Sequence, residues 1–256
     1  KVTITLTNDA ANKNSHSIDL HAARVDVVKD FESIKPGETK TFSFTVNYPG
    51  AFYYHCGSDP MYQHIARGMF GVILVEPKDA KALPKADREY VLVQSEIYAN
   101  PDDQHSIMRG DWKHVAFNGM AFKYDPVHDP AATRMLVAKP GERVRLRFIN
   151  ASAMSFFDVR IPGLKMSVVQ SDGQNVEPVA VDEFRFAPAE TYDVIVTPKD
   201  SKPYTIAAES IDRSGFALGT LATSEGQRGE IPKPRERALL TMADMNMEMM
   251  MKDDPD

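Results

Sequence analysis

The sequence of 256 residues contains a single cysteine, has no excess of basic residues, and lacks any long apolar run. One cysteine cannot form a disulfide within the chain, so cysteine usage does not indicate a redox compartment. A helix that spans a membrane needs about 20 consecutive apolar residues, and no stretch of this sequence approaches that length. The net charge of −6 argues against a nucleic-acid partner, because a surface that binds phosphates is basic.

A signal peptide is also missing from the sequence. It begins with KVTITLTND, in which Val2, Ile4 and Leu6 alternate with polar residues as they do in a half-buried strand. A sequence that begins inside a strand is expected to be a processed or truncated product.

Helical periodicity is nearly absent, with one candidate turn near residues 101–108. Alternating patterns rich in β-branched residues recur instead, separated by turn signals: TFSFTVNYPG, GVILVEP, EYVLVQSE, RVRLRFIN, YDVIVTP and YTIAAES. In the first of them Phe42, Phe44 and Val46 share one face. The sequence therefore predicts an all-β protein built from sandwiches or Greek-key barrels.

Length and turn signals predict two domains in tandem. The motif KPGE precedes an alternating strand twice, at residues 35–38 and 139–142, as expected if one kind of β-domain is used twice. We predict a first domain over residues 1–80, which carries the metal ligands, and a linker over 81–88. A second domain without obvious ligands follows over 89–225, and a charged, Pro-containing segment with a Met-rich tail occupies 226–256.

The single cysteine lies among residues that bind soft metals. The segment YYHCGSDPMYQHIARGM places Cys56, His64 and Met69 on one loop between two predicted strands. A thiolate, two imidazoles and a weak axial thioether form the ligand set of blue, type 1 copper, which transfers one electron. The missing imidazole must come from a neighbouring strand, and the segment HSIDLHAA supplies His16.

These two segments contain a second set of ligands. Successive side chains of a strand point to opposite faces, so His16 and His21, five positions apart, are expected at different sites. The adjacent His55 and Cys56 are separated in the same way. We predict one copper at His16 and Cys56, and a second at His21 and His55. The His55-Cys56 bond would give electrons a short path between the two. Asp19 is predicted as the catalytic proton donor to a group bound at the second copper.

Each residue taken alone has a simpler explanation. A buried cysteine is usually a small hydrophobe, and Met69 alone would be ordinary core. Six ligand positions with consistent parity in two segments favour copper over these alternatives. His105, His114 and His128 show no such spacing, and we interpret them as ordinary polar loop residues.

The ligand segments HSIDLHAA and GAFYYHCGSDPMYQHIARGM together resemble the first cupredoxin domain of copper-containing nitrite reductases, in the multicopper oxidase superfamily. The likeness continues through VAFNGMAFKYDPVHDP and TRMLVAKPGERVR, over about the first 145 residues. It implies two Greek-key cupredoxin-like domains in tandem. It also implies that Asp19 is a catalytic aspartate. By the same resemblance, a type 1 copper is bound by His16, Cys56, His64 and Met69. A type 2 copper is bound by His21 and His55.

From about Leu146 the sequence is more similar to the middle domain of copper-resistance multicopper oxidases, as in AESIDRSGFALGTLA and LLTMADMNM. In the nitrite reductases the third type 2 ligand is a histidine from a neighbouring subunit, and here no histidine follows His128. The resemblance thus implies a type 2 site that lacks one imidazole. The tail is either a flexible acidic segment or a weak Cu(I) site made of thioethers: Met242, Met245, Met247, Met249, Met250 and Met251.

The resemblance implies a copper oxidoreductase that reduces nitrite to nitric oxide. One alternative is a laccase-like or copper-resistance oxidase that uses dioxygen, but its trinuclear cluster takes eight histidines and the chain has seven. The other is a non-catalytic type 1 electron-transfer module, which the missing imidazole favours. By the same resemblance we expect a homotrimer, a small redox protein as electron donor, and a periplasmic or secreted location.

Overall fold

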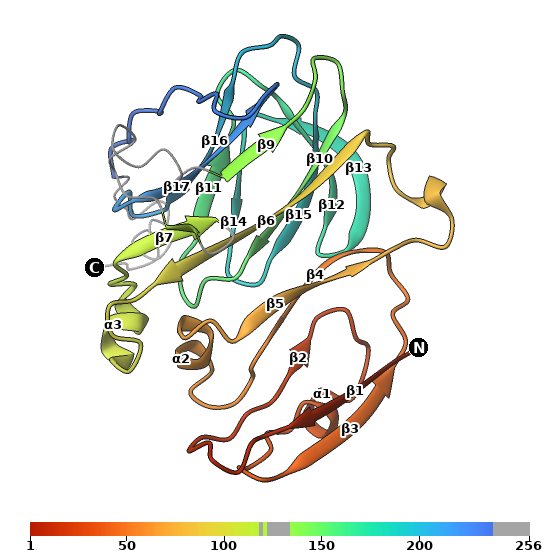
Figure 1. Ribbon diagram of the computed structural model, residues 1–256, viewed down its shortest axis with the longest axis vertical. Coiled ribbons are helices and arrows are strands. Elements are labelled where there is room, and N and C mark those ends of the chain that lie inside the picture. The colour runs from red at the N-terminus through yellow and green to blue at the C-terminus, as the bar shows by residue number, and fades with distance from the viewer. Residues whose placement is uncertain (118–119, 122–133, 238–256) are drawn as a thin grey trace, which may run out of the picture.

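The computed structural model describes residues 1–117, 120–121 and 134–237. Within these ranges the chain forms four β-sheets joined by loops and short helices (Figure 1). The prediction of an all-β protein is therefore confirmed. No helix in the described ranges has the length and apolar character needed to cross a bilayer.

The first strands form a two-stranded antiparallel ribbon at one end of the molecule, made of β1 (Val2–Thr7) and β3 (Thr39–Phe44). Phe42 and Phe44 are buried on one face of this ribbon, and Val46 packs against the same apolar cluster. The predicted apolar face is therefore confirmed. On the opposite face, hydroxyl groups pair across the two strands.

A three-stranded antiparallel sheet carries the residues predicted to bind metal: β2 (Asp19–Leu20), β4 (Gly50–His55) and β5 (Phe70–Val75). The prediction of one extended strand through residues 16–23 is wrong, because only two residues pair with β4. His16 forms an isolated bridge outside this ladder. Hydrogen bonds outside the ladder occupy the backbone on both sides of β2. Before it, the Ser17 amide donates to the sulfur of Cys56, and after it, the Ala23 amide donates to the Leu20 carbonyl and closes a turn.

In the part of the chain that the structure describes, four short helical segments interrupt the strands: α1 (Val27–Asp30), α2 (Met61–Ala66), η1 (Ala80–Ala82) and α3 (Gln104–Arg109). The side chains of Asp26, Asp79 and Asp103 accept amide protons at the starts of α1, η1 and α3, and Gly110 ends α3 with φ +69°. Helix α3 confirms the turn predicted near residues 101–108. Helix α2 was not predicted, although it lies inside the ligand-bearing loop.

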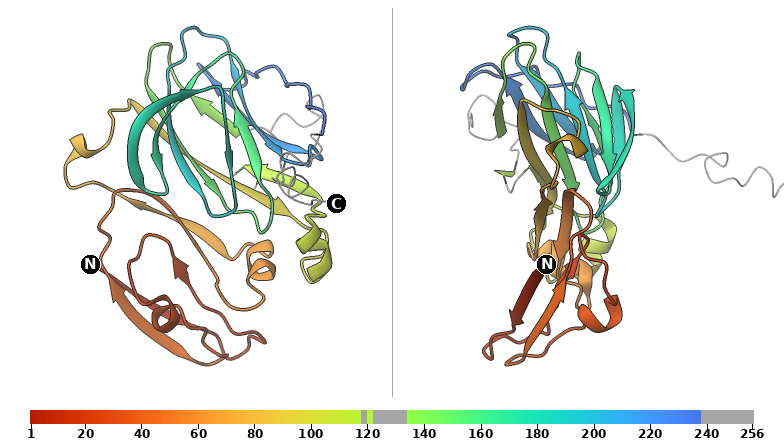
Figure 2. Two further views of the ribbon diagram at one scale, coloured as in Figure 1. Left: turned by 180° about the vertical axis from the view of Figure 1, so that it is seen from behind. Right: turned by 90° about the vertical axis from the view of Figure 1, so that its right-hand side faces the viewer.

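The second half of the chain forms two larger sheets that pack face to face (Figure 2). The seven-stranded sheet has the order β13-β12-β15-β10-β6-β7-β8, and the five-stranded sheet has the order β14-β11-β16-β17-β9. Their strands are β6 (Arg88–Ile97), β7 (His114–Phe117), β8 (Met120–Ala121), β9 (Arg134–Val137), β10 (Val144–Asn150), β11 (Phe157–Arg160), β12 (Met166–Ser171), β13 (Gln174–Val181), β14 (Glu183–Phe186), β15 (Thr191–Val196), β16 (Tyr204–Ser210) and β17 (Phe216–Ala222). Phe148, Phe157 and Phe186 are fully buried in the core between the sheets.

The two halves meet along β4. Ala51 and Tyr53 share a buried cluster with Ile149 and Ala151, which lie at the end of β10. The tip of the β12–β13 hairpin also approaches β4 closely, and a Cβ atom added to Gly173 would lie 2.2 Å from the ring of Phe52. The first half therefore sits against one end of the larger sandwich. The boundaries of the two domains and their linker stay a prediction.

Candidate metal centres

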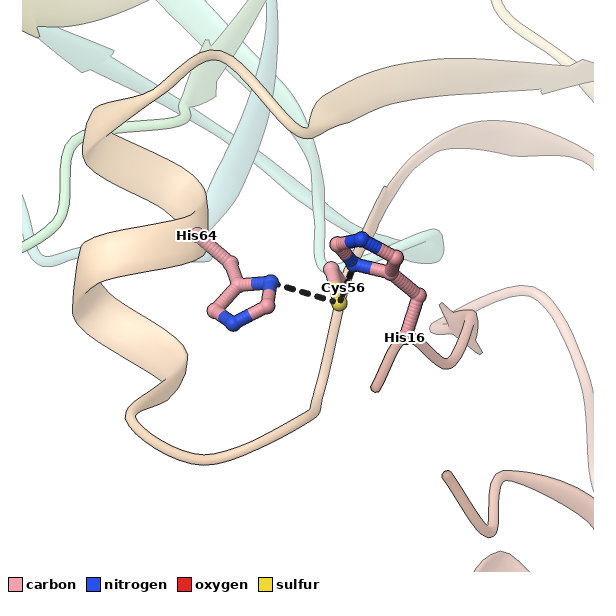
Figure 3. A group of neighbouring side chains, drawn as sticks. All are labelled: His16, Cys56 and His64. Carbon is pink, nitrogen blue, oxygen red and sulfur yellow. Dashed lines mark hydrogen bonds between the residues drawn. The ribbon is translucent and has the colours of Figure 1, made fainter. Parts of the chain in front are cut away.

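Three of the predicted type 1 ligands converge in the structure. The Sγ atom of Cys56 lies 3.3 Å from Nδ1 of His64 and 3.8 Å from Nδ1 of His16 (Figure 3). The cysteine and His64 are buried, and His16 is half-buried. We call this group of three residues the first cluster.

Each residue of the first cluster comes from a different local structure. Cys56 directly follows β4, His64 lies on α2, and His16 is held by its backbone bridge to Ile34. Ser17 joins these parts, because its amide donates to the cysteine sulfur at 3.4 Å and its hydroxyl accepts from the Gly57 amide at 3.0 Å.

The donor atoms of the first cluster fit one metal ion. Metal–sulfur bonds of about 2.3 Å and metal–nitrogen bonds of about 2.0–2.1 Å, joined at angles of about 100–120°, give sulfur–nitrogen separations of about 3.3–3.8 Å. The two measured separations lie in that interval. A thiolate with two imidazoles is also the donor set that suits copper.

Met69 approaches this cluster through its backbone. Its amide donates to the His64 carbonyl at 3.1 Å, and its carbonyl accepts from the Cys56 amide at 3.0 Å. The side chain of Met69 is 36% exposed. The assignment of its thioether as the axial ligand stays a prediction.

A second group of ligands lies on the other side of the β2–β4 pair. Asp19 stands opposite His55 in the strand register, and His21 follows two positions later. The Nε2 atoms of His21 and His55 are 3.3 Å apart, and one donor atom of each of the three residues lies within 4.8 Å of the others. We call these three residues the second cluster.

The geometry of His55 leaves one ring nitrogen free for a metal. Its Nδ1 lies 3.0 Å from the Cys56 carbonyl, which can only accept, so Nδ1 carries the proton and Nε2 has a lone pair. Two metal–nitrogen bonds of about 2.05 Å at an angle of about 107° would span the 3.3 Å between the two Nε2 atoms. The two imidazoles therefore fit one shared ion.

Burial keeps three of the imidazoles, those of His16, His21 and His64, in the form that binds metals. It lowers the pKa of His16, and it lowers the pKa of His64 together with the positive charges of His16 and Arg67. For His21, burial again lowers the pKa and outweighs the opposing charge of Asp19. Neutral imidazoles are metal ligands, so no proton has to be displaced from these rings near neutral pH.

Family models match both halves of the chain. Residues 88–226 match a model described as multicopper oxidase, and residues 1–80 match a second model with the same description. The chain belongs to the multicopper oxidase family. This membership confirms the predicted cofactor, copper, and the cupredoxin-like fold. Members of the family are copper oxidoreductases.

Individual relatives of the chain include a copper-resistance protein and a nitrite reductase, the two kinds of protein that its sequence resembles. Copper resistance protein A of Escherichia coli is 36% identical over 85% of this chain and 42% of its own length. Copper-containing nitrite reductase of Neisseria gonorrhoeae is 36% identical over 57% of this chain and 38% of its own length. The chain thus spans less than half the length of these curated relatives.

Among solved structures, copper nitrite reductase of Nitrosomonas europaea has a TM-score of 0.78 and 48% identity, and the match covers 88% of this chain and 80% of that one. In this comparison the likeness to a nitrite reductase extends well beyond residue 145. Leu146 itself is fully buried in the middle of β10, so no structural boundary marks the switch that the sequence predicts there.

A cavity of about 450 Å³ lies beside the second cluster of this multicopper oxidase chain. Its lining includes His21 and Asp19, and the second half of the chain contributes Asp172 and Glu190. Arg24 is the cation in this lining. The cavity therefore presents three carboxylates and one guanidinium next to an imidazole.

Sequence reasoning missed several residues that shape these centres. Ser17 went unnoticed because a serine between two histidines has no distinctive pattern. The Asp172-Gly173 pair is a hairpin signal, but the sequence does not show that this hairpin reaches the first half. The interpretation of His105 and His114 as loop residues is wrong, because His105 lies in α3 and His114 begins β7. Neither joins a cluster of possible metal ligands in the described ranges. His128 and the six methionines of the tail lie outside the described residues.

Proposed function

We propose that this chain carries both copper centres of a nitrite reductase that forms nitric oxide. His16, Cys56, His64 and Met69 would hold a type 1 copper, and His21 and His55 would hold a type 2 copper. The observation that carries this proposal is the pair His55-Cys56, because one peptide link joins the first cluster to the second. The 48% identity to the Nitrosomonas europaea enzyme supports it.

The reaction consumes one electron and two protons for each nitrite: one N–O bond breaks, and nitric oxide and water form. Copper would supply one-electron transfer at the first cluster and a Lewis-acid position for nitrite at the second. Cys56 and His55 would provide the electron path. Asp19, beside His21 in the wall of the cavity, would hold one proton and deliver it to the departing oxygen. Solvent in the open cavity would deliver the second proton.

The test is nitric oxide release from nitrite by the copper-loaded chain with a one-electron donor. We expect Asp19→Asn to lower kcat by about 10²–10⁴-fold, the usual contribution of a general acid. Asp172→Asn is the matched control, because Asp172 lines the same cavity but already accepts the Thr191 amide proton at 2.8 Å. It should cost no more than about tenfold. Absence of nitric oxide from the unmodified chain, or equal losses in the two variants, would contradict the proposal.

A second candidate function is the oxidation of Cu(I) with dioxygen as the electron acceptor. Three carboxylates against one guanidinium in the cavity favour a cation over an anion, and copper resistance protein A of Escherichia coli matches 85% of this chain. Four Cu(I) ions and four protons would reduce one dioxygen to two waters. Oxygen uptake that depends on added Cu(I), without nitric oxide formation from nitrite, would select this candidate.

From the same likeness we propose a small redox protein as the electron donor, a homotrimer, and a periplasmic or secreted location. Light scattering coupled to size-exclusion chromatography tests the trimer directly. A monomer at micromolar concentration would contradict it.

A further inference from the structure

Tyr53 lies between the second cluster and the second half of the chain. It lies two residues before His55 in β4, so both side chains point to the same face of the sheet. Its exposed fraction is 1%, and it packs in one buried cluster with Ile149 and Ala151 of the second half. The ring is therefore held in place by apolar contacts with the second half of the chain.

The rings of Tyr53, His21 and His55 form a closed triangle. Tyr53 stacks on His55 with ring centroids 4.9 Å apart and an interplanar angle of 29°. It meets His21 edge-on at 5.4 Å and 85°, and the two imidazoles meet each other at 5.3 Å and 71°. Each ring thus contacts the other two, and one rigid tyrosine ring supports both imidazoles.

The ring of Tyr53, and not its hydroxyl, makes the contacts with the two histidines. Its oxygen is buried and makes no hydrogen bond within the described part of the chain. A buried hydroxyl without a partner destabilises the fold, and a phenylalanine would fill the same space without that cost. The flat ring is the part of Tyr53 that contacts the histidines.

We propose that the ring of Tyr53 is a positioning group that holds the imidazoles of His21 and His55 in the orientation needed to share one metal ion. The hydrogen bond from His55 Nδ1 to the Cys56 carbonyl fixes that ring at one point only. Rotation about this point remains open, and the stacked face of Tyr53 blocks it. Residues behind metal ligands commonly affect metal affinity in this way. The inference rests on the second cluster of the proposed function, but the positioning itself is a property of the metal-free chain.

The first experiment uses the metal-free chain and NMR of the histidine rings. We expect sharp signals from His21 and His55, shifted by the ring current of Tyr53, in the unmodified chain and in Tyr53→Phe. Tyr53→Met keeps an apolar side chain but is smaller, more flexible and without a flat face, and it should broaden both signals. Tyr54→Leu is the matched control, because Tyr54 belongs to the same strand but packs in the apolar cluster of the first half. It should leave the two signals sharp.

The second experiment measures Cu(II) affinity and the paramagnetic resonance spectrum in a Cys56→Ala background, which removes the thiolate. Tyr53→Met should weaken Cu(II) binding at the second cluster by about tenfold or more and give a mixture of spectra. Tyr53→Phe and Tyr54→Leu should stay within about twofold of the parent.

Three results would overturn the inference: sharp histidine signals in Tyr53→Met, equal losses in Tyr53→Phe and Tyr53→Met, or equal losses in Tyr54→Leu and Tyr53→Met. If Tyr53→Met does not fold, Tyr53→Phe and Tyr54→Leu still test the inference, because broadened histidine signals in either of these two variants would contradict it. Ordered imidazoles in a chain that binds no second copper would refute the proposed function and leave the positioning established.

Discussion

A cluster of charged side chains around two buried carboxylates provides the sharpest test of how this fold is stabilised. It lies on the five-stranded sheet and consists of Asp158, Glu183, Glu209, Arg160, Arg185, Arg213 and Arg235. The Asp158 side chain is 2% exposed and contacts Arg185 and Arg213 at 2.7 Å each, and Arg235 at 3.2 Å. Replacing the Asp158 carboxylate with the amide of asparagine removes three ion pairs and leaves the volume of the side chain nearly unchanged.

We predict that Asp158→Asn lowers the free energy of unfolding by about 3 kcal/mol. Removing one partner of a buried ion pair costs about 3–5 kcal/mol, because the remaining charge is left without compensation. Arg213 is 9% exposed and cannot rehydrate, whereas Arg185 is 52% exposed and can turn toward water. The effect should therefore fall at the lower end of that range.

The matched control is Asp182→Asn. The Asp182 carboxylate contacts Lys165 at the same distance, 2.7 Å, but the two side chains are 80% and 66% exposed. An exposed pair contributes about 0–1 kcal/mol. Urea denaturation of both variants at neutral pH, followed by circular dichroism, measures the difference. Equal changes in the two variants would show that burial does not set the strength of these pairs and would refute the reasoning.

The same carboxylate should make stability depend on acid. Burial raises the pKa of Asp158, but hydrogen bonds from Arg185 and Arg213 outweigh burial, so its pKa lies below its ordinary value. A group whose pKa is lower in the folded state stabilises the fold above its unfolded pKa of about 3.9, and this contribution is lost as the pH falls through the folded value. The difference in the free energy of unfolding between the parent and Asp158→Asn should therefore be constant from pH 7 to about pH 5. It should shrink toward zero as the pH falls below about 4.

Three further predictions concern the metal centres and the contact between the halves. Cys56→Ser should abolish the blue absorption of the copper-loaded chain and leave a colourless copper at the second cluster, as measured by optical and paramagnetic resonance spectra. Ser17→Ala should lower stability by about 0.5–1.5 kcal/mol in a denaturant titration and shift the blue band, since the Gly57 amide loses a partly buried hydrogen bond. Gly173→Ala should lower the melting temperature, because Gly173 has φ +72° and its new Cβ would overlap the Phe52 ring. An alanine held at this positive φ lowers the stability of the fold by about 1–2 kcal/mol, in addition to the cost of the overlap. An unchanged melting temperature would contradict the close contact of the hairpin with β4.

Most of the strands were predictable from the sequence, because a half-buried strand needs alternating apolar residues and these survive in the chain as a visible period. The same alternation predicted that the side chains of Cys56 and His55 point to different sides of the strand. Helix α2 was not predicted, because its six residues are too few to show an amphipathic period and Pro60 at its start makes no side-chain cap of the kind that Asp103 makes for α3. Its presence matters, since it presents His64 to the cysteine sulfur.

The sequence by itself determined the fold class, the cofactor and the division of the histidines between the two clusters. These depend on local properties: residue type, and the alternation of side chains along an extended backbone. Only the tertiary structure decided that His16 reaches Cys56 from outside the strand ladder, that Tyr53 contacts both imidazoles of the second cluster, and that Asp172 lines the cavity. Those contacts join segments far apart in the chain, and packing between sheets, which no local pattern records, brings them together.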